Sequence, residues 1–339
     1  MDDSALVRRL VSTVLSADPD IEVVGTATDG NEAIARVDDL RPDAVTLDIE
    51  MPGLDGLGAL AGIRARHPRL PVIMFSTLTE KGASQTLEAL TLGASDYVTK
   101  PSNTGSIAES MTSVRQQLVP KIKALTGMRR MVATTVTVPA ARVVPATTRP
   151  QVLLIGCSTG GPDALSSVLA ALPADLSVPV LVVQHMPAVF TTIFAARLDR
   201  VSPLRVREAA TGDVLRPGEV LVAPGDHHLR IQRSASGEVR AVLDQGDQVN
   251  FCRPAVDVLL SSAAQVYRGN AVVLILTGMG QDGMEGCRTL HDLGASIVVQ
   301  DESTSVVWGM PGAVAGAGLA DRVLPLGHIA ADLTAMLKG

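Results

Sequence analysis

A serine flanked by glycines, in the stretch Gly156-Cys157-Ser158-Thr159-Gly160, follows the apolar run QVLLI and precedes a segment of helical period. This G-x-S-x-G pattern is typical of a sharp strand-to-helix turn that exposes a nucleophilic hydroxyl, because glycines remove Cβ clashes. A similar turn can instead bind phosphate at a helix N-terminus. The spacing is not G-x-G-x-x-G, however, so it favours Ser158 as a nucleophile over a dinucleotide site.

A serine hydroxyl is a weak nucleophile until an imidazole takes its proton, and a carboxylate must orient that imidazole. His185 ends the apolar run VPVLVVQH, where a strand end would place it beside Ser158. Asp282 lies in the glycine-rich turn TGMGQDG after AVVLIL. Alone, Asp282 could equally be a helix cap. The order serine, histidine, aspartate also differs from the α/β-hydrolase order, in which the acid precedes the histidine.

A second group of polar residues also follows apolar runs. Asp48 comes after AVTL, and Asp2 and Asp3 precede the helical stretch ALVRRLVSTVLSA. Carboxylates at adjoining loop tips are the oxygen ligands that Mg²⁺ prefers, although single aspartates there are often helix caps. Lys100, after DYVT, could hold a phosphoryl group on Asp48, and Ser76, ending PVIMFS, could offer a hydroxyl there.

Two series of alternating strands and helices must position these residues. In the first, the runs IEVVGTAT, AVTLD, PVIMFST and DYVT alternate with helical segments up to about Leu125, which predicts a parallel sheet. Residues 126–150 lack a sustained period and are rich in Thr, Val, Ala, Arg and Pro, so we expect a linker. The second series begins at QVLLIG and includes a strand-rich stretch around residues 214–243. It predicts a doubly wound, mainly parallel sheet with a β insertion.

The composition limits the function classes. A chain of 339 residues with 46% hydrophobic residues suggests two domains, and 29 basic against 35 acidic residues argue against a nucleic-acid partner. The three cysteines are far apart and predict neither a disulfide framework nor a zinc cluster. No stretch approaches the roughly 20 apolar residues of a membrane span, so we expect a cytoplasmic protein without membrane insertion.

The N-terminal region resembles a response-regulator receiver domain in Asp2-Asp3, LDIEMPGLDG, FST and DYVTKP. This resemblance implies a flavodoxin-like fold that is phosphorylated by a chemotaxis histidine kinase with Mg²⁺ as cofactor. It assigns phosphorylation to Asp48, metal binding to Asp2, Asp3 and Asp48, phosphate contact to Lys100, and a switch to Ser76 and Tyr97. Receivers carry a hydrophobic strand before the acidic pair, whereas this sequence begins at the pair. We therefore expect that either the true start lies upstream or the receiver is damaged, since a missing central strand would be costly.

Residues 151–339 resemble the catalytic domain of the chemotaxis protein-glutamate methylesterases, the CheB family, in IGCSTGGP, VQHMP, APGDHHL, CRPAVDVL and TGMGQDG. The resemblance implies Ser158 as nucleophile, His185 as general base and acid, and Asp282 as orienting carboxylate. Further residues implied in the substrate and oxyanion vicinity are Thr159, Met279 and Gly280. Cys157 stands where the family commonly has alanine.

The expected domains are therefore a receiver over residues 1–125, a linker over 126–150 and a methylesterase over 151–339. The resemblance implies hydrolysis of glutamate γ-methyl esters on methyl-accepting chemotaxis receptors, with methanol release, glutamine deamidation and control by phosphorylation. The esterase itself should need no cofactor. Two alternatives stay open at this point: a regulator whose output only binds a partner, and a nucleotide-binding domain that uses residues 156–161 as a phosphate nest.

Overall fold

A computed structural model describes residues 1–101, 106–127 and 149–338. The chain divides into two compact units, Met1–Ala133 and Thr134–Gly339, which are described separately below. The predicted linker over residues 126–150 lies mostly outside the described residues.

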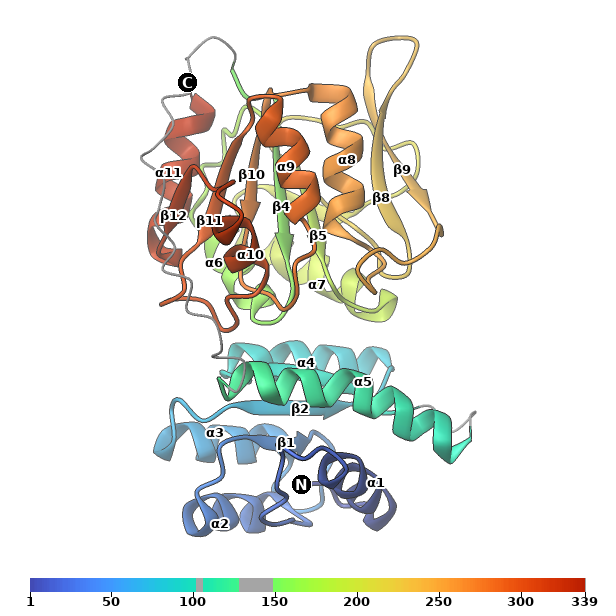
Figure 1. The fold of residues 1–339 in the computed structure, drawn as a ribbon, viewed down its shortest axis with the longest axis vertical. Helices are drawn as coiled ribbons and strands as arrows, with labels where there is room; N and C mark the ends of the chain where they lie inside the picture. The colour runs from blue at the N-terminus through green and yellow to red at the C-terminus, as the bar shows by residue number, and fades with distance from the viewer. Residues whose placement is uncertain (102–105, 128–148, 339) are drawn as a thin grey trace. The chain divides into compact units, whose positions relative to one another are not determined.

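The first unit is a parallel three-stranded sheet in the order β1-β2-β3 (Figure 1). Its strands and helices, in chain order, are α1 (Ala5–Ser16), α2 (Gly30–Leu40), β1 (Val45–Asp48), α3 (Gly56–Arg66), β2 (Val72–Ser76), α4 (Glu80–Thr91), β3 (Asp96–Thr99) and α5 (Ile107–Leu125). Helix α1 contacts α5, and α2, α3 and α4 contact one another in succession. The sheet therefore places Asp48 and Ser76 at its carboxyl edge, with Lys100 just beyond β3.

One predicted strand is absent, because the run IEVVGTAT at residues 21–28 is not a strand in the structure. The start of the chain bonds both β1 and this segment: Met1 N donates to Thr46 O and Asp48 N donates to Met1 O, both at 2.9 Å, while Asp2 N donates to Ala27 O at 3.2 Å. Beside these residues lies a cavity of about 310 Å³, lined in part by Val7, Val11, Leu15, Val23 and Val45. Without a neighbouring strand, the segment has no ladder to join.

The second unit is a seven-stranded, wholly parallel sheet in the order β12-β11-β10-β4-β5-β7-β6. Its elements up to the insertion are β4 (Val152–Cys157), α6 (Gly161–Ala171), β5 (Val180–Gln184), α7 (Ala188–Val201), β6 (Arg205–Glu208) and β7 (Glu219–Val222). After the insertion come α8 (Val256–Tyr267), β10 (Ala271–Ile275), α9 (Met284–Asp292), β11 (Ser296–Gln300), α10 (Met310–Gly316), β12 (Arg322–Leu324) and α11 (Leu326–Lys338).

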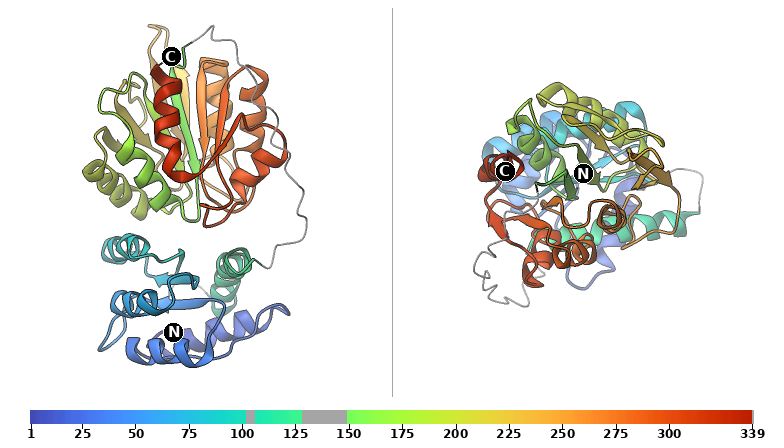
Figure 2. Two further views of the ribbon diagram at one scale, coloured as in Figure 1. Left: turned by 90° about the vertical axis from the view of Figure 1, so that its left-hand side faces the viewer. Right: turned by 90° about the horizontal axis from the view of Figure 1, so that it is seen from above.

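Helices cover both faces of this sheet (Figure 2). Helix α6 contacts α7 and α11 on one side, and helix α9 contacts α8 and α10 on the other. Strands β4, β5 and β10 are buried along their whole length, as their Val, Ile and Leu runs predict for strands covered on both faces. The predicted doubly wound architecture is confirmed.

The predicted β insertion is the antiparallel hairpin of β8 (His228–Arg233) and β9 (Val239–Asp244). It contacts α8, and its buried residues Leu229, Ile231 and Ala241 join the main hydrophobic core. The hairpin therefore anchors the segment that runs from β9 to α8, on which part of the site is built.

The order of the strands determines where a ligand can bind. The chain leaves the central strand β4 towards β5 on one side and returns to β10 on the other. The strand order reverses at β4, and in open α/β sheets such a switch point forms a crevice at the carboxyl ends of the strands. Ser158, His185 and Thr277 all lie just beyond these ends. Among the described residues, no helix combines the length and apolarity that crossing a lipid bilayer requires.

Candidate active site

The turns after β4, β5 and β10 are tied together through their backbones. His185 N donates to Cys157 O at 3.1 Å, and Ser158 N donates to Thr277 O at 3.0 Å. In the β4–β5 register Cys157 lies opposite Gln184. The next residues along the two strands, Ser158 and His185, therefore leave the sheet side by side.

The side chain of Gln184, at the end of β5, also joins the Ser158 and His185 turns. Its buried side chain donates from Nε2 to the carbonyl oxygens of Ser158 at 3.0 Å and of His185 at 3.2 Å. Gly161 N also donates to Ser158 O, and a Cβ at Gly161 would lie only 2.1 Å from Gln184 Oε1. The glycine is thus required by close packing, and the amide holds both turns. Sequence reasoning did not identify Gln184, because a polar residue within an apolar strand gives no indication of its partners.

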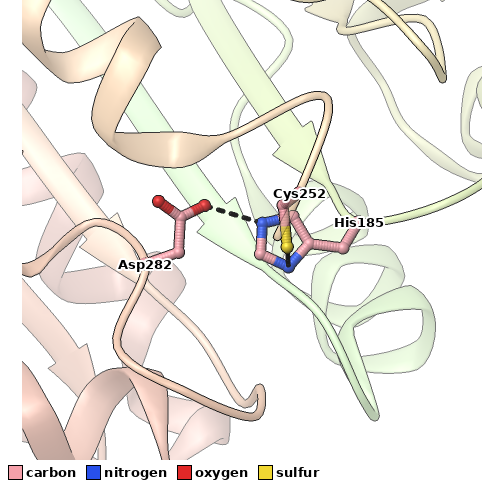
Figure 3. Close-up of side chains that lie close together, drawn as sticks. All are labelled: His185, Cys252 and Asp282. Atoms are coloured by element: carbon pink, nitrogen blue, oxygen red, sulfur yellow. Dashed lines mark hydrogen bonds and ion pairs between the residues drawn. The ribbon is translucent and has the colours of Figure 1, made fainter. Parts of the chain in front are cut away.

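His185 and Asp282 form the hydrogen-bonded pair of the site, with Nε2 of His185 2.8 Å from Oδ2 of Asp282 (Figure 3). The carboxylate of Asp282 is buried and also accepts hydrogen bonds from Val256 N at 2.6 Å and Asp257 N at 3.1 Å. Asp282 therefore caps α8, which precedes it in the sequence, whereas α9 directly after it begins at Met284 and is preceded by Gly283 with φ +94°. The carboxylate of Asp282 therefore both caps α8 and bonds the imidazole of His185.

The pair is also polarised electrostatically. Burial alone lowers the pKa of His185, but the hydrogen bonds and charges of Asp282 and Cys252 outweigh it and raise that pKa. Burial acts to raise the pKa of Asp282, but His185 and the two amides of α8 lower it. The carboxylate thus stays ionised and stabilises an imidazolium, the state that a general base passes through.

A tight turn that the sequence did not point to completes the site. Val249 and Cys252 exchange backbone hydrogen bonds, and the two residues between them, Asn250 and Phe251, have φ of +53° and +62°. Asn250 Nδ2 donates to Asp282 Oδ1 at 3.0 Å, and Cys252 Sγ lies 3.5 Å from His185 Nδ1. Both contacts span long stretches of sequence, so no local pattern could have revealed them.

The other predicted residues lie around Ser158. Thr159 is buried, and its carbonyl accepts from Thr277 Oγ1 at 2.9 Å. Gly280 has φ +80°, a conformation that favours glycine. Within the described parts of the chain, Ser158 Oγ makes no hydrogen bond, and the amides of Met279 and Gly280 have no acceptor. The structure thus joins His185 to Asp282 and sets the Ser158 turn beside the His185 turn.

In the first unit, Asp2, Asp48 and Lys100 meet at the carboxyl edge of the sheet. Lys100 Nζ lies 2.7 Å from Asp48 Oδ2 and 3.2 Å from Asp2 Oδ2. Burial raises the pKa of Asp48 to about 6, with Asp2 adding to the shift and Lys100 opposing it. Burial acts to lower the pKa of Lys100, but the two carboxylates raise it. The predicted acidic cluster is therefore present.

This cluster fits a hard dication. One carboxylate oxygen from each of Asp2, Asp3 and Asp48 lies within 4.8 Å of the others. Asp2 Oδ2 is buried, and it faces the ammonium of Lys100 at 3.2 Å. Three carboxylates held this close repel one another, and a metal ion that takes oxygen ligands would offset that repulsion.

The two predicted switch residues are both buried. Ser76 Oγ accepts from Thr86 Oγ1 at 2.6 Å and donates to Gly82 O at 3.2 Å, which ties it to α4. Tyr97 is 8% exposed, and Lys121 Nζ lies 5.3 Å from its ring centroid. Ser76 is thus bonded to two residues of α4.

Comparison with known proteins identifies both units. The family model described as CheB methylesterase matches residues 153–333, and the model described as response regulator receiver domain matches residues 1–112. A protein of Nocardioides sp. named protein-glutamate methylesterase/protein-glutamine glutaminase is 54% identical over 96% of this chain and 91% of its own length. One of the same name from Trichodesmium erythraeum is 45% identical over 98% of this chain and 96% of its own.

A solved structure agrees with these relatives. The crystal structure of the Thermotoga maritima CheB methylesterase catalytic domain matches with a TM-score of 0.54 and 42% identity, over 55% of this chain and 98% of that domain. Together with the Ser158, His185 and Asp282 turns at one sheet edge, these matches are decisive. The chain belongs to the CheB methylesterase family and carries an N-terminal response regulator receiver domain.

Proposed function

We propose that the second unit hydrolyses γ-methyl esters of glutamate side chains on methyl-accepting chemotaxis receptors through a triad of Ser158, His185 and Asp282. The observation that carries the proposal is the 2.8 Å bond from His185 to Asp282 directly beside the Ser158 turn. The names of the relatives support the same reaction class. Neither alternative, a regulator whose output only binds a partner or a nucleotide-binding domain with a phosphate nest, gives the His185–Asp282 pair a role.

In the proposed reaction, Ser158 Oγ attacks the ester carbonyl while His185 removes its proton. The protonated imidazole then gives that proton to the departing methoxide, so methanol leaves and a glutamyl-serine ester remains. Water, deprotonated by His185, attacks this ester and releases the glutamate carboxylate together with free Ser158. Asp282 stabilises the imidazolium in both steps, which requires it to remain ionised.

The oxyanion of each tetrahedral intermediate needs hydrogen-bond donors. The amides of Met279 and Gly280, which have no acceptor among the described residues, are the donors that we assign to it. Backbone amides held by a glycine turn cost no reorganisation when charge develops, and each is worth about 3 kcal/mol. The same chemistry applied to a glutamine side chain releases ammonia, so we include deamidation in the proposal.

The first unit would control this activity through phosphorylation of Asp48 by a chemotaxis histidine kinase. Asp2, Asp3 and Asp48 would hold Mg²⁺, which when bound supplies positive charge that neutralises the incoming phosphoryl group. Lys100, already at 2.7 Å from Asp48, would contact the phosphoryl oxygens. Ser76 would then replace its hydrogen bonds to α4 with one to the phosphoryl group, so that phosphorylation would change the contacts of α4.

Replacement of Ser158 by alanine tests the proposal. Methanol release from methylated receptor should fall at least about 10³-fold, because removal of a triad nucleophile has losses of this order. Ser166→Ala is the matched control, since Ser166 Oγ bonds only its own helix at Pro162 O. That variant should keep wild-type turnover. Undiminished methanol release by the Ser158 variant would reject the triad.

A further inference from the structure

The thiol of Cys252, the imidazole of His185 and the carboxylate of Asp282 are in contact in that order, so the thiol occupies the position of a nucleophile next to a carboxylate-backed imidazole. Its Sγ lies 3.5 Å from Nδ1 of His185, whose Nε2 is bonded to Asp282 Oδ2 at 2.8 Å (Figure 3). When Nε2–H donates a hydrogen bond to Asp282, the lone pair of Nδ1 is left to accept the thiol proton. An imidazole backed by a carboxylate is the arrangement that activates cysteine nucleophiles.

We infer that Cys252 is a modification site for soft electrophiles such as peroxides, and that the group added to its sulfur stops the esterase by blocking the approach of Ser158 Oγ to His185 Nδ1. The inference rests on the proposed role of His185 as general base. Only one lone pair is free on the imidazole, and a modified sulfur beside it would prevent the transfer of the Ser158 proton.

The other two cysteines provide an internal comparison. Cys157 and Cys287 are each fully buried, and burial raises the pKa of both thiols. Cys252 is only partly buried and contacts an ionisable base. Thiolate character and access decide which cysteines react. Electrophiles should therefore modify Cys252 in preference to Cys157 and Cys287, because Cys252 is more accessible and contacts the base His185.

The turn that carries Cys252 holds the thiol in place. Paired backbone hydrogen bonds join Val249 to Cys252, and the Asn250 side chain is bonded to Asp282 Oδ1 and to Asp257 Oδ2. Cys252 and Asp282 are therefore fixed to the same turn, on either side of the imidazole.

The proposed reaction with hydrogen peroxide is balanced. His185 takes the thiol proton, and the sulfur attacks one peroxide oxygen, so that an S–O bond forms as the O–O bond breaks. Sulfur loses two electrons and becomes a sulfenic acid, while the other oxygen leaves as water with the proton held by His185. One small thiol converts the sulfenic acid into a mixed disulfide and water, and a second thiol attacks that disulfide and releases the free cysteine.

Alkylation of the full-length native chain with iodoacetamide, mapped by mass spectrometry, tests the thiol. Cys252 should be modified at least about tenfold faster than Cys157 or Cys287, and several-fold more slowly when His185→Gln removes the base. Asp282→Asn is the second variant, in case the first is unstable. If Cys252 were alkylated at the same rate in the wild type and in these variants, the inference would be overturned, because exposure of the thiol alone would then explain its reactivity.

Peroxide treatment tests the consequence for turnover. Wild-type activity should fall in step with Cys252 oxidation and return with dithiothreitol, whereas Cys252→Ser and Cys252→Ala should each keep their own untreated activity. Equal loss in these variants would contradict the inference. Ser158→Ala separates it from the proposed function: Cys252 should still be alkylated in that variant, whereas surviving methanol release would reject only the triad.

Discussion

His185 Nε2 lies 2.8 Å from Asp282 Oδ2, although the two residues are 97 positions apart in the sequence. The contact exists because β5 and β10 flank the same central strand, so that the turns following them converge. The same carboxylate caps α8 through two amides. Orientation of the base and the start of a core helix therefore depend on one side chain.

The first prediction concerns pH and Asp282→Asn. Because Asp282 helps to raise the pKa of His185, the free base is populated only on the alkaline side, and turnover should rise with pH through that pKa. Removing the carboxylate charge lowers the pKa, so the rising limb should move to lower pH. The maximal rate should nevertheless fall by about 10²–10⁴-fold, because the tautomer is no longer held. A pH–rate profile with an unmoved limb would contradict this account.

The second prediction concerns Asn250, whose amide bridges Asp282 and Asp257. Loss of a hydrogen bond to a charged group costs about 1.5–3 kcal/mol, so Asn250→Ala should lower kcat roughly tenfold or more. Asn250→Gly is the matched control for backbone conformation, because φ is +53° here and glycine adopts it freely. Both variants should lose similar activity, with the alanine variant less stable to heat. Wild-type kcat in the glycine variant would show that the side chain has no positioning role.

The third prediction concerns Gln184, which holds the carbonyls of Ser158 and His185. Gln184→Met keeps the volume but removes both bonds, and should reduce the free energy of unfolding by about 1–3 kcal/mol. It should also reduce kcat more than it changes KM, since the turns would lose their alignment. Denaturant unfolding and steady-state kinetics on the same preparation measure the two effects. Unchanged kcat with reduced stability would limit Gln184 to a structural role.

The fourth prediction concerns Asp48, whose pKa is raised to about 6 by burial. Only the ionised carboxylate attacks phosphorus, and at pH 5 about a tenth of it is ionised, so phosphorylation by acetyl phosphate should slow below pH 6. Bound Mg²⁺ favours the ionised form, so higher Mg²⁺ should move the midpoint to lower pH. Asp48→Asn should abolish phosphorylation at every pH. A midpoint that does not respond to Mg²⁺ would argue against the three-aspartate site.

Much of the fold could be predicted from the sequence, because strands buried on both faces are continuous apolar runs. The candidate residues Ser158, His185 and Asp48 were recognisable as polar residues at the ends of such runs, and Asp282 by its glycine-rich turn. Residues 21–28 were wrongly predicted as a strand, since their apolar pattern says nothing about whether a neighbouring strand is present to pair with them.

The contacts made by Cys252, Asn250 and Gln184 could not be predicted. Cys252 meets His185 across 67 residues and Asn250 meets Asp282 across 32, through a turn whose two positive φ values fall on non-glycine residues. Asn250 adopts a positive φ readily, but the bulky Phe251 does not, so local sequence preferences do not predict this turn. Only the folded arrangement of the hairpin and α8 brings it to the imidazole.

The most direct test of the account is labelling of the full chain with a serine-directed fluorophosphonate, followed by peptide mapping. We expect a single adduct on Ser158, formed much more slowly in Asp282→Asn and absent in Ser158→Ala. An adduct on another residue, or equal labelling when His185 is replaced by glutamine, would contradict the proposed triad.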